Sequence, residues 1–140
     1  MDHLESLFAR HRLRLTAPRR ALFQLLESFH EPVEINQIIQ HIGQGDRTSV
    51  YRNLDVFISL GVVSIIPLGW KKRYELAAPF APHHHHLQCK QCDELVAIDT
   101  PRLERVIADI ALEHGYELTQ HHIELTGVCS RCKKVNSPTP

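Results

Sequence analysis

Four cysteines stand in the second half of this sequence as two CxxC pairs, Cys89 with Cys92 and Cys129 with Cys132. A CxxC spacing lets one tetrahedral cation bind both thiolates of a pair, and two pairs complete a site of four thiolates. In a reducing compartment such pairs bind metal more often than they form disulfides. The pattern therefore predicts a structural Zn²⁺ site, with two disulfides or free thiols as the alternatives.

A run of four histidines, residues 83–86, directly precedes the first pair. The run is internal, so it is not a purification tag. If it lies in an extended strand, successive side chains point to opposite faces. His83 and His85 then share one face, while His84 and His86 share the other. Four such imidazoles cannot all serve one ion, which indicates two metal sites; a solvated loop is the alternative.

The second half offers further ligands for the first of these faces. In a predicted strand, His121 alternates in phase with Ile123 and Leu125 and should face the core, whereas His122 should face solvent. Glu104 falls at the edge of the apolar face of a predicted helix, from which its carboxylate can reach inward. These residues predict a site of three nitrogens and one oxygen. Its ligands are His83, His85, Glu104 and His121.

The other pair, His84 and His86, would face the first half of the chain. Glu75, at the end of a predicted hairpin, is a reasonable third ligand across the segment "APFAP". An ion bound by residues of both halves would stabilise only the orientation that it can coordinate. The sequence therefore predicts a regulatory site between two domains.

The elements that position the second-half ligands have clear boundaries. Thr100 fits the N-cap of a helix, Pro101 its first position and Gly115 its end. The predicted core is small for a segment of this length, so bound Zn²⁺ would supply much of its folding free energy. That core consists of Leu95, Val96, Ile98, Leu103, Val106, Ile107, Ile110, Ile123 and Leu125.

The first half reads as three helices and a β-hairpin. Apolar residues recur at helical spacing after Thr16, which can cap a helix with Pro18 in its first turn. The same pattern recurs in residues 34–42, which end at Gly43, and in a third segment that ends at Gly61. The stretches "VVSII" and "WKKRYEL" then flank "PLG", which is typical of a hairpin. This order predicts a winged helix-turn-helix, whose second motif helix enters the major groove of DNA.

The polar face of the third helix has the chemistry to read DNA. Arg52 could bind phosphate or guanine, Ser49 and Asn53 could form hydrogen bonds, and Tyr51 could contact thymine methyls or sugars. Between residues 6 and 26 there are five arginines and no acidic residue, so this stretch can neutralise phosphates. A merely solvated helix face is the alternative. The expected DNA contacts are Arg14, Arg19, Thr48, Ser49, Tyr51 and Arg52.

Composition sets outer limits. The 140 residues suit one ordinary domain or two small ones, and the 43% hydrophobic content is that of a globular protein. No apolar run approaches the roughly 20 residues of a membrane helix, and no signal peptide is visible, so we expect a cytoplasmic protein without membrane association. The net charge of zero neither favours nor excludes nucleic acid.

Together these motifs resemble the ferric-uptake-regulator (Fur) family of bacterial metal-dependent repressors. The resemblance runs from about residue 7 to 133 and includes "TSVYRNLDVFISLGVV", "HHHHLQCKQC" and "LTQHHIELTGVCSRC". It implies an α+β fold, with a winged-helix DNA-binding domain (1–78), a hinge (79–82) and an α/β dimerisation domain with a Cys₄ zinc site (83–140). It also implies a homodimer that binds palindromic operator DNA when a divalent metal is bound.

Carried over by position, the resemblance assigns the four cysteines to structural zinc and Glu75, His84 and His86 to the interdomain regulatory site. The four residues of the N₃O set match the family's second metal site. Tyr51 and Arg52 match the "VYR" signature of the recognition helix. Arg14 takes the place of a basic residue that reaches the minor groove.

Two positions depart from the family's pattern in the regulatory site. Ala97 stands where an acidic ligand is usual, and Pro32 stands where a histidine is usual, with His30 as a nearby substitute. Glu75 is a hard ligand, which favours Fe²⁺ or Mn²⁺, although a site with several imidazoles also binds Zn²⁺ well. The resemblance to the family implies Fe²⁺ as the sensed ion. A zinc-sensing, manganese-sensing or peroxide-sensing repressor is the alternative within the family. Outside it, a small zinc hydrolase needs an open coordination position and a base, and a metal-buffering protein needs no DNA.

Overall fold

The computed structural model describes residues 1–43, 47–68, 71–119, 121 and 123–135. The chain forms two compact units, residues 1–82 and 83–140. The expected turn at 44–46, the hairpin tip at 69–70 and the expected solvent-facing His122 lie outside the described residues. No described helix is long and apolar enough to cross a membrane.

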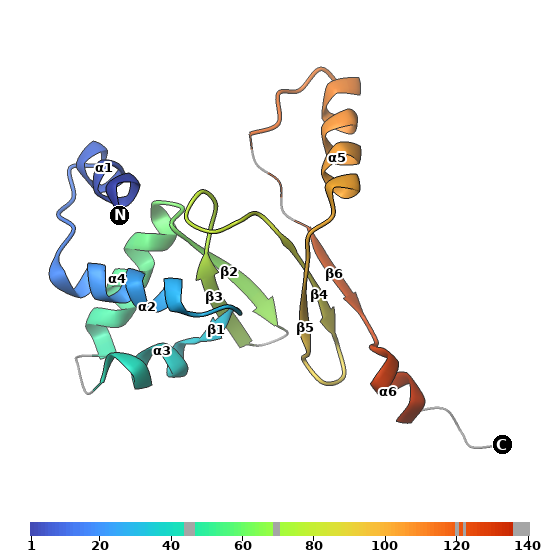
Figure 1. Cartoon of the computed structure of the whole chain (residues 1–140), viewed down its shortest axis with the longest axis horizontal. Helices are drawn as coiled ribbons and strands as arrows, with labels where there is room; N and C mark the ends of the chain where they lie inside the picture. The colour runs from blue at the N-terminus through green and yellow to red at the C-terminus, as the bar shows by residue number, and fades with distance from the viewer. Residues whose placement is uncertain (44–46, 69–70, 120, 122, 136–140) are drawn as a thin grey trace. The chain divides into compact units, whose positions relative to one another are not determined.

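Four helices make up most of the first unit (Figure 1). Thr16 occupies the N-cap of the second helix and Pro18 lies in its first turn, although the Thr16 side chain makes no capping hydrogen bond. Gly43 and Gly61 end the next two helices with positive φ, as the sequence predicts. The first helix was not predicted; the chain start reads as amphipathic, and its apolar face is buried. The helices are α1 (Asp2–Arg10), α2 (Ala17–Ser28), α3 (Ile35–Ile42) and α4 (Arg47–Ser59).

A three-stranded antiparallel sheet completes the first unit, in the order β1-β3-β2. The predicted hairpin is present, but Pro67 and Leu68 continue the strand instead of forming the turn, with Leu68 opposite Lys71. The short strand that pairs with the hairpin was not predicted, because two residues carry no alternation signal. The strands are β1 (Val33–Glu34), β2 (Val63–Leu68) and β3 (Lys71–Leu76).

The core of the first unit lies between these helices and one face of the sheet. Phe57 of α4 meets Phe8 of α1 and Phe23 of α2 edge-on, at ring-centroid distances of 5.9 and 6.5 Å. The unit thus has the arrangement of a winged helix-turn-helix, with α3 and α4 as the motif helices and β2–β3 as the wing. Phe80 and Ala81, in the predicted hinge, pack against this core. Its buried residues are Leu4, Phe8, Leu22, Phe23, Leu26, Val33, Ile38, Val50, Leu54, Phe57, Val62, Val63 and Leu76.

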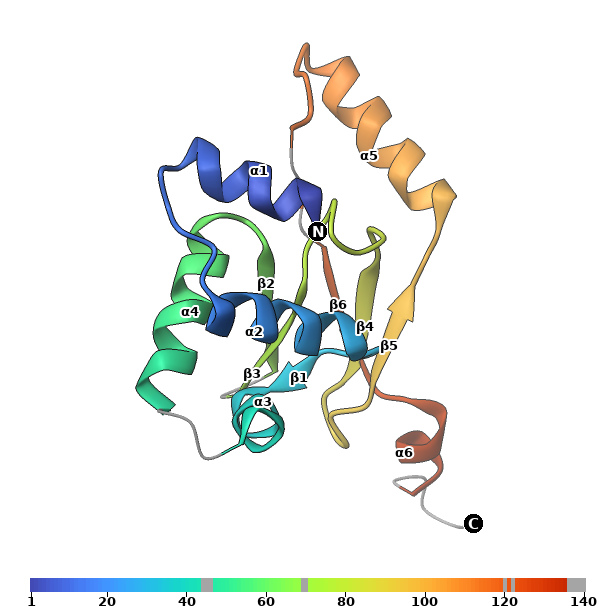
Figure 2. The same ribbon diagram turned by 60° about the vertical axis from the view of Figure 1, so that its left-hand side comes forward.

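The second unit is a three-stranded sheet with two helices. The strand order is β5-β4-β6, in which β4 pairs antiparallel with β5 and parallel with β6. Figures 1 and 2 show α5 projecting beyond one end of this sheet. The strands begin two to three residues later than expected, so the first two histidines and His121 lie just outside them. The elements are β4 (His85–Cys89), β5 (Leu95–Ile98), α5 (Pro101–Glu113), β6 (Glu124–Gly127) and α6 (Ser130–Val135).

The caps of α5 agree with the sequence. The Leu103 N–H donates to the Thr100 hydroxyl at 3.2 Å, Pro101 is the first helical residue, and Gly115 follows the C-cap with φ of 72°. Only glycine adopts this left-handed conformation at little cost, so the helix stops there.

The residues predicted to form the core of the second unit are not buried within a single chain. Among the described residues of this unit only His85, His86 and Cys89 are buried. No residue of α5 is buried, and Ile110 is 53% exposed. The sheet adds an in-register row of half-exposed apolar side chains, Val96, Leu87 and Leu125, on the face that also carries His85. The predicted residues form an apolar surface instead.

Candidate metal centres

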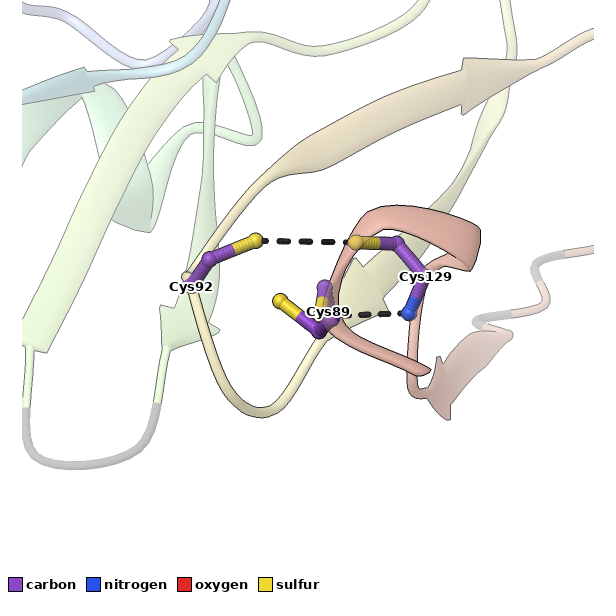
Figure 3. Close-up of side chains that lie close together, drawn as sticks. Cys89, Cys92 and Cys129 are labelled. Atoms are coloured by element: carbon purple, nitrogen blue, oxygen red, sulfur yellow. Dashed lines mark hydrogen bonds between the residues drawn. The ribbon is translucent and has the colours of Figure 1, made fainter. Parts of the chain in front are cut away.

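The four cysteines converge, as their spacing predicts. Cys89 ends β4, Cys92 lies in the turn after it, Cys129 immediately precedes α6, and Cys132 lies within α6. Their sulfur atoms all lie within 4.8 Å of one another. Figure 3 shows Cys92 and Cys129 pointing toward each other across this cluster, with Sγ atoms 3.8 Å apart.

This geometry fits zinc. A tetrahedral site with Zn–S bonds of about 2.3 Å has sulfur–sulfur edges of about 3.8 Å. The backbone N–H of Cys129 donates to the Cys89 sulfur at 3.3 Å, and this hydrogen bond, followed by one from Gln91, lowers the pKa of Cys89 to about 6. Hydrogen bonding within the thiol cluster, first from Cys129, raises the pKa of Cys132 to about 12. The Cys89 thiolate is therefore formed at neutral pH, whereas a cation must displace the proton of Cys132 as it binds.

A cationic side chain lies at the exposed side of the cluster. Arg131, inside the second CxxC, donates to the Cys92 sulfur at 3.6 Å and to the Glu94 carboxylate at 3.3 Å. The Cys92 sulfur and the Glu94 carboxylate raise the pKa of Arg131 further above its usual value. This pair was not predicted from the sequence, because Glu94 and Arg131 come together only when the two CxxC segments meet.

The second cluster joins β4, α5 and the segment before β6. His85 Nε2–H donates to Glu104 Oε1 at 2.7 Å, and the Nε2 atoms of His83 and His121 each lie 3.3 Å from a Glu104 oxygen. The His121 Nε2 lies 3.0 Å from that of His83 and 3.4 Å from that of His85. Bonds of about 2.0–2.1 Å in a tetrahedral site give ligand separations of about 3.3–3.4 Å. The four side chains are thus close to the arrangement in which they would hold a divalent cation.

Glu104 supplies the anionic member of this set. The hydrogen bond from His85 and the positive charges of His121 and His83 lower the pKa of Glu104, against the opposing effect of burial. The carboxylate therefore stays ionised, which is the form that coordinates metal. His85 is almost fully buried, at 3% exposure, so the site is anchored in the sheet.

His84 and His86 form a pair separate from His83 and His85, as the alternation of side chains along an extended chain requires. The His84 and His86 rings lie 4.8 Å apart, centroid to centroid, as do those of His83 and His85. In the sheet, His86 stands between Ala97 of β5 and Glu124 of β6, in register with both. Ala97, one of the two departures from the family pattern, is thus the direct cross-strand neighbour of His86. Glu124 was not singled out from the sequence.

The remaining predicted ligands belong to the first unit. Glu75 is half-buried on β3, opposite Ser64. His30 is exposed in the bend between α2 and β1, and it joins no ligand cluster that the described residues form. Pro32 follows in the same segment. The shared site of Glu75, His84 and His86 stays a prediction.

Comparison with known proteins identifies the family. The sequence model of the ferric uptake regulator family matches residues 10–126. The chain is 34% identical to the ferric uptake regulation protein of Campylobacter jejuni over 140 aligned positions, covering 94% of this chain and 87% of that protein. The chain belongs to the ferric uptake regulator family.

Other similarities within the family are more distant. The chain is 28% identical to the peroxide-responsive repressor PerR of Staphylococcus saprophyticus, over 86% of this chain and 83% of that protein. The ferric uptake regulator Fur of Helicobacter pylori has the same fold, with a TM-score of 0.77, 21% identity and coverage of 97% of this chain and 93% of that one. As a Fur-family member the chain is a transcription regulator and not an enzyme, which excludes the hydrolase alternative.

Five of the six predicted DNA contacts are exposed, on α4 and in the segment before α2. Thr48, Ser49, Tyr51 and Arg52 are exposed on α4. Arg14 is exposed in the segment between α1 and α2.

Arg19 is placed differently from the other predicted DNA contacts. Its side chain is half-buried and turned toward the protein, where it contacts Asn53, the Arg14 carbonyl and the Phe8 ring. Its place in the basic stretch alone predicted a DNA contact, since Asn53 lies 34 residues away in the chain.

Proposed function

We propose that this Fur-family regulator is a repressor that binds palindromic operator DNA as a homodimer when Fe²⁺ is bound. The observation that carries the proposal is the sorting of the four consecutive histidines into two pairs. His83 and His85 belong to the N₃O cluster of the second unit, whereas the ring of His84 contacts that of His86, which follows His85 in β4 and points to the other face. An ion in the N₃O cluster and a regulatory ion can then be held by separate ligand sets, apart from the zinc of the four cysteines.

The exposed apolar surface of the second unit supports the homodimer. A unit that buries almost no apolar side chain by itself cannot offset the conformational entropy of folding. The sheet row of Leu87, Val96 and Leu125 and the exposed side of α5 with Val106 and Ile110 form apolar surfaces of the kind buried between subunits. A second copy of this chain would cover them with the same surface, as twofold symmetry requires.

The exposed polar face of α4 supports the DNA contact. Tyr51 and Arg52 are exposed on it, beside Thr48 and Ser49. A guanidinium suits guanine or phosphate, and a hydroxyl can donate to either. Two such helices in a symmetric dimer would read the two halves of a palindrome.

The regulatory step requires a ligand set shared between the units. In this proposal Glu75, His84 and His86 hold the regulatory ion, with Fe²⁺ favoured over Zn²⁺ by the carboxylate and by the name of the 34% identical relative. Bound there, the ion supplies a cross-link that is satisfied in one orientation of the units only. A peroxide-sensing function is the second candidate, since relatives at 28–29% identity are peroxide-responsive repressors.

A DNA-binding titration tests the function. The purified chain would be titrated anaerobically onto a duplex from its own upstream region, with Fe²⁺, Mn²⁺ or Zn²⁺, and compared with a scrambled duplex. We expect Fe²⁺-dependent binding to the first duplex only. Failure to bind with every ion would refute the repressor function, while binding with Zn²⁺ or Mn²⁺ alone would replace the proposed ion.

The double variant His84→Ala/His86→Ala tests the regulatory site. We expect it to lose metal-dependent DNA binding while sedimenting as the same dimer as the unmodified chain. Unchanged DNA affinity in this variant would contradict the role of these histidines.

A further inference from the structure

One guanidinium connects the elements that carry the predicted DNA contacts. The Arg19 Nε–H donates to Asn53 Oδ1 at 3.2 Å, and Nη1–H donates to the Arg14 carbonyl oxygen at 2.6 Å. The Arg19 guanidinium carbon also lies 5.4 Å from the centroid of the Phe8 ring, a distance at which a cation and a ring attract each other. Each contact involves a different structural element.

These contacts fix three separate segments against α2. Arg19 is the third residue of α2, Asn53 lies in the middle of α4, and Arg14 lies in the segment that joins α1 to α2. Phe8 is buried in the core from α1. Because the ring and both hydrogen bonds engage one planar group, a shift of any of these segments relative to α2 would weaken its contact with Arg19.

The position of Asn53 on α4 makes this contact relevant to DNA reading. Asn53 follows Tyr51 and Arg52 directly, and each residue turns a helix by about 100°. Holding the Asn53 side chain toward α2 therefore sets the direction in which Tyr51 and Arg52 point. The bond to the Arg14 carbonyl likewise restrains the backbone from which the Arg14 side chain extends.

We propose that Arg19 is a positioning residue, which holds the Arg14 segment and α4 at the spacing that operator DNA requires. It was expected from the sequence to bind DNA itself. The proposal rests on the proposed function, in which α4 and Arg14 contact the operator. An arginine is needed because only a planar guanidinium donates in two fixed directions while stacking on a ring.

A lysine at this position separates the two roles. Lysine keeps the positive charge, so a residue that only neutralises phosphate should tolerate Arg19→Lys. A positioning residue should not tolerate this change, because an ammonium group cannot donate the two hydrogen bonds in the fixed directions of the guanidinium. The two roles also differ in selectivity: loss of a phosphate contact weakens binding to every sequence, whereas loss of alignment weakens binding to the operator alone.

The experiment compares Arg19→Lys and Arg19→Gln with the unmodified, metal-loaded chain by fluorescence anisotropy. The probes are the upstream duplex and its scrambled control, at several KCl concentrations from about 50 to 200 mM. We expect both variants to lose about tenfold in affinity for the upstream duplex, as the loss of charge-assisted hydrogen bonds implies. Affinity for the scrambled duplex and the salt dependence should stay unchanged. Arg20→Lys is the matched control, because this neighbour pairs instead with Glu5.

A double-mutant cycle with Asn53→Ala separates coupling from general destabilisation. If Arg19 acts through Asn53, Arg19→Lys should cost much less in the Asn53→Ala background than in the unmodified chain. The proposal is overturned if Arg19→Lys binds the upstream duplex as tightly as the unmodified chain does. It is also overturned if Arg19→Gln lowers the affinity for both duplexes equally and reduces the slope of log affinity against log salt concentration by about one. Additive effects in the cycle would also overturn it. An unmodified chain that binds no DNA with any ion would instead refute the proposed function.

Discussion

His85 and Glu104 join the sheet of the second unit to α5 through a hydrogen bond of 2.7 Å. In the described part of the chain, Glu104 is the residue of α5 whose side chain hydrogen-bonds to β4, and none of the helix's residues is buried. The N₃O cluster therefore supplies a polar connection between α5 and the sheet in a single chain. An ion held by this cluster would connect α5 to β4 by coordinate bonds.

Glu104→Gln should abolish the second ion-binding site. The amide keeps the shape of the side chain but removes the anionic ligand, and we expect affinity at this site to fall by about 100-fold or more, since loss of an outer-shell partner alone costs about 10–100-fold. Metal analysis after dialysis should show one ion fewer per chain than in the control Glu113→Gln, which lies at the exposed end of the same helix. Equal metal content in the two variants would rule out Glu104 as a ligand.

Cys89→Ser should unfold the second unit. The unit has little core of its own, and structural zinc contributes roughly 10–16 kcal/mol of binding free energy, comparable to or greater than the stability of a whole domain. Circular dichroism should show loss of the second unit's transition, and zinc should be absent. Ser130→Ala, between the two cysteines of the other pair, should melt like the unmodified chain. A zinc-free Cys89→Ser protein with an unchanged melt would disprove the structural role.

Arg131→Ala should make the zinc site more labile. Arg131 donates to the exposed Cys92 sulfur and to Glu94, so it partly neutralises the tetrathiolate and restrains one ligand. Because the side chain is well exposed, we expect an effect at the low end of outer-shell losses, about tenfold faster zinc transfer to a chelator. Lys134→Ala, at the end of the same helix, serves as the control. Identical transfer rates in the two variants would mean that the Arg131 contact does not protect the site.

The metal ligands of the second unit were predictable because local geometry determines them. The CxxC spacing brings two sulfurs together in any fold, and the alternation of an extended chain separates His83 and His85 from His84 and His86. The ends of α5 were likewise predictable, since Thr100, Pro101 and Gly115 determine them through interactions with residues that are only a few positions away in the sequence.

The features that were not predicted depend on residues that are distant in the sequence or on contacts with another molecule. The position of Arg19 was missed because Asn53 lies 34 residues away. The apolar stripe of α5 was assigned to a core, since periodicity identifies an apolar face without identifying what covers it. The burial of Leu4 and Phe8 was missed because an amphipathic chain start reads the same whether it packs or not.

The stability of the first unit should fall at alkaline pH through Tyr74. Burial, and then the negative charges of Tyr51 and Asp55, raise the pKa of Tyr74 above 10.0. The folded chain therefore holds this proton more tightly than the unfolded chain, so the contribution of Tyr74 to stability is fully present below about pH 10 and is lost as the pH rises above it. Tyr74→Phe should remove that part of the decrease in urea unfolding midpoints between about pH 9 and 11. An identical pH dependence in this variant would contradict the assignment.

Ile110→Glu should separate the proposed homodimer. Ile110 lies on the apolar stripe of α5 and is exposed in a single chain, so it is available to a second copy. Burying a carboxylate there without a partner should weaken dimerisation by at least about 2 kcal/mol, or roughly 30-fold in the dissociation constant. Sedimentation velocity across a concentration series would measure the shift. Arg105→Glu introduces the same side chain on α5 but points about 140° away from Ile110, so it should leave the dimer intact. If both variants sediment like the unmodified chain, α5 lies outside the dimer interface, and the apolar row of Leu87, Val96 and Leu125 would be the remaining surface for a second copy.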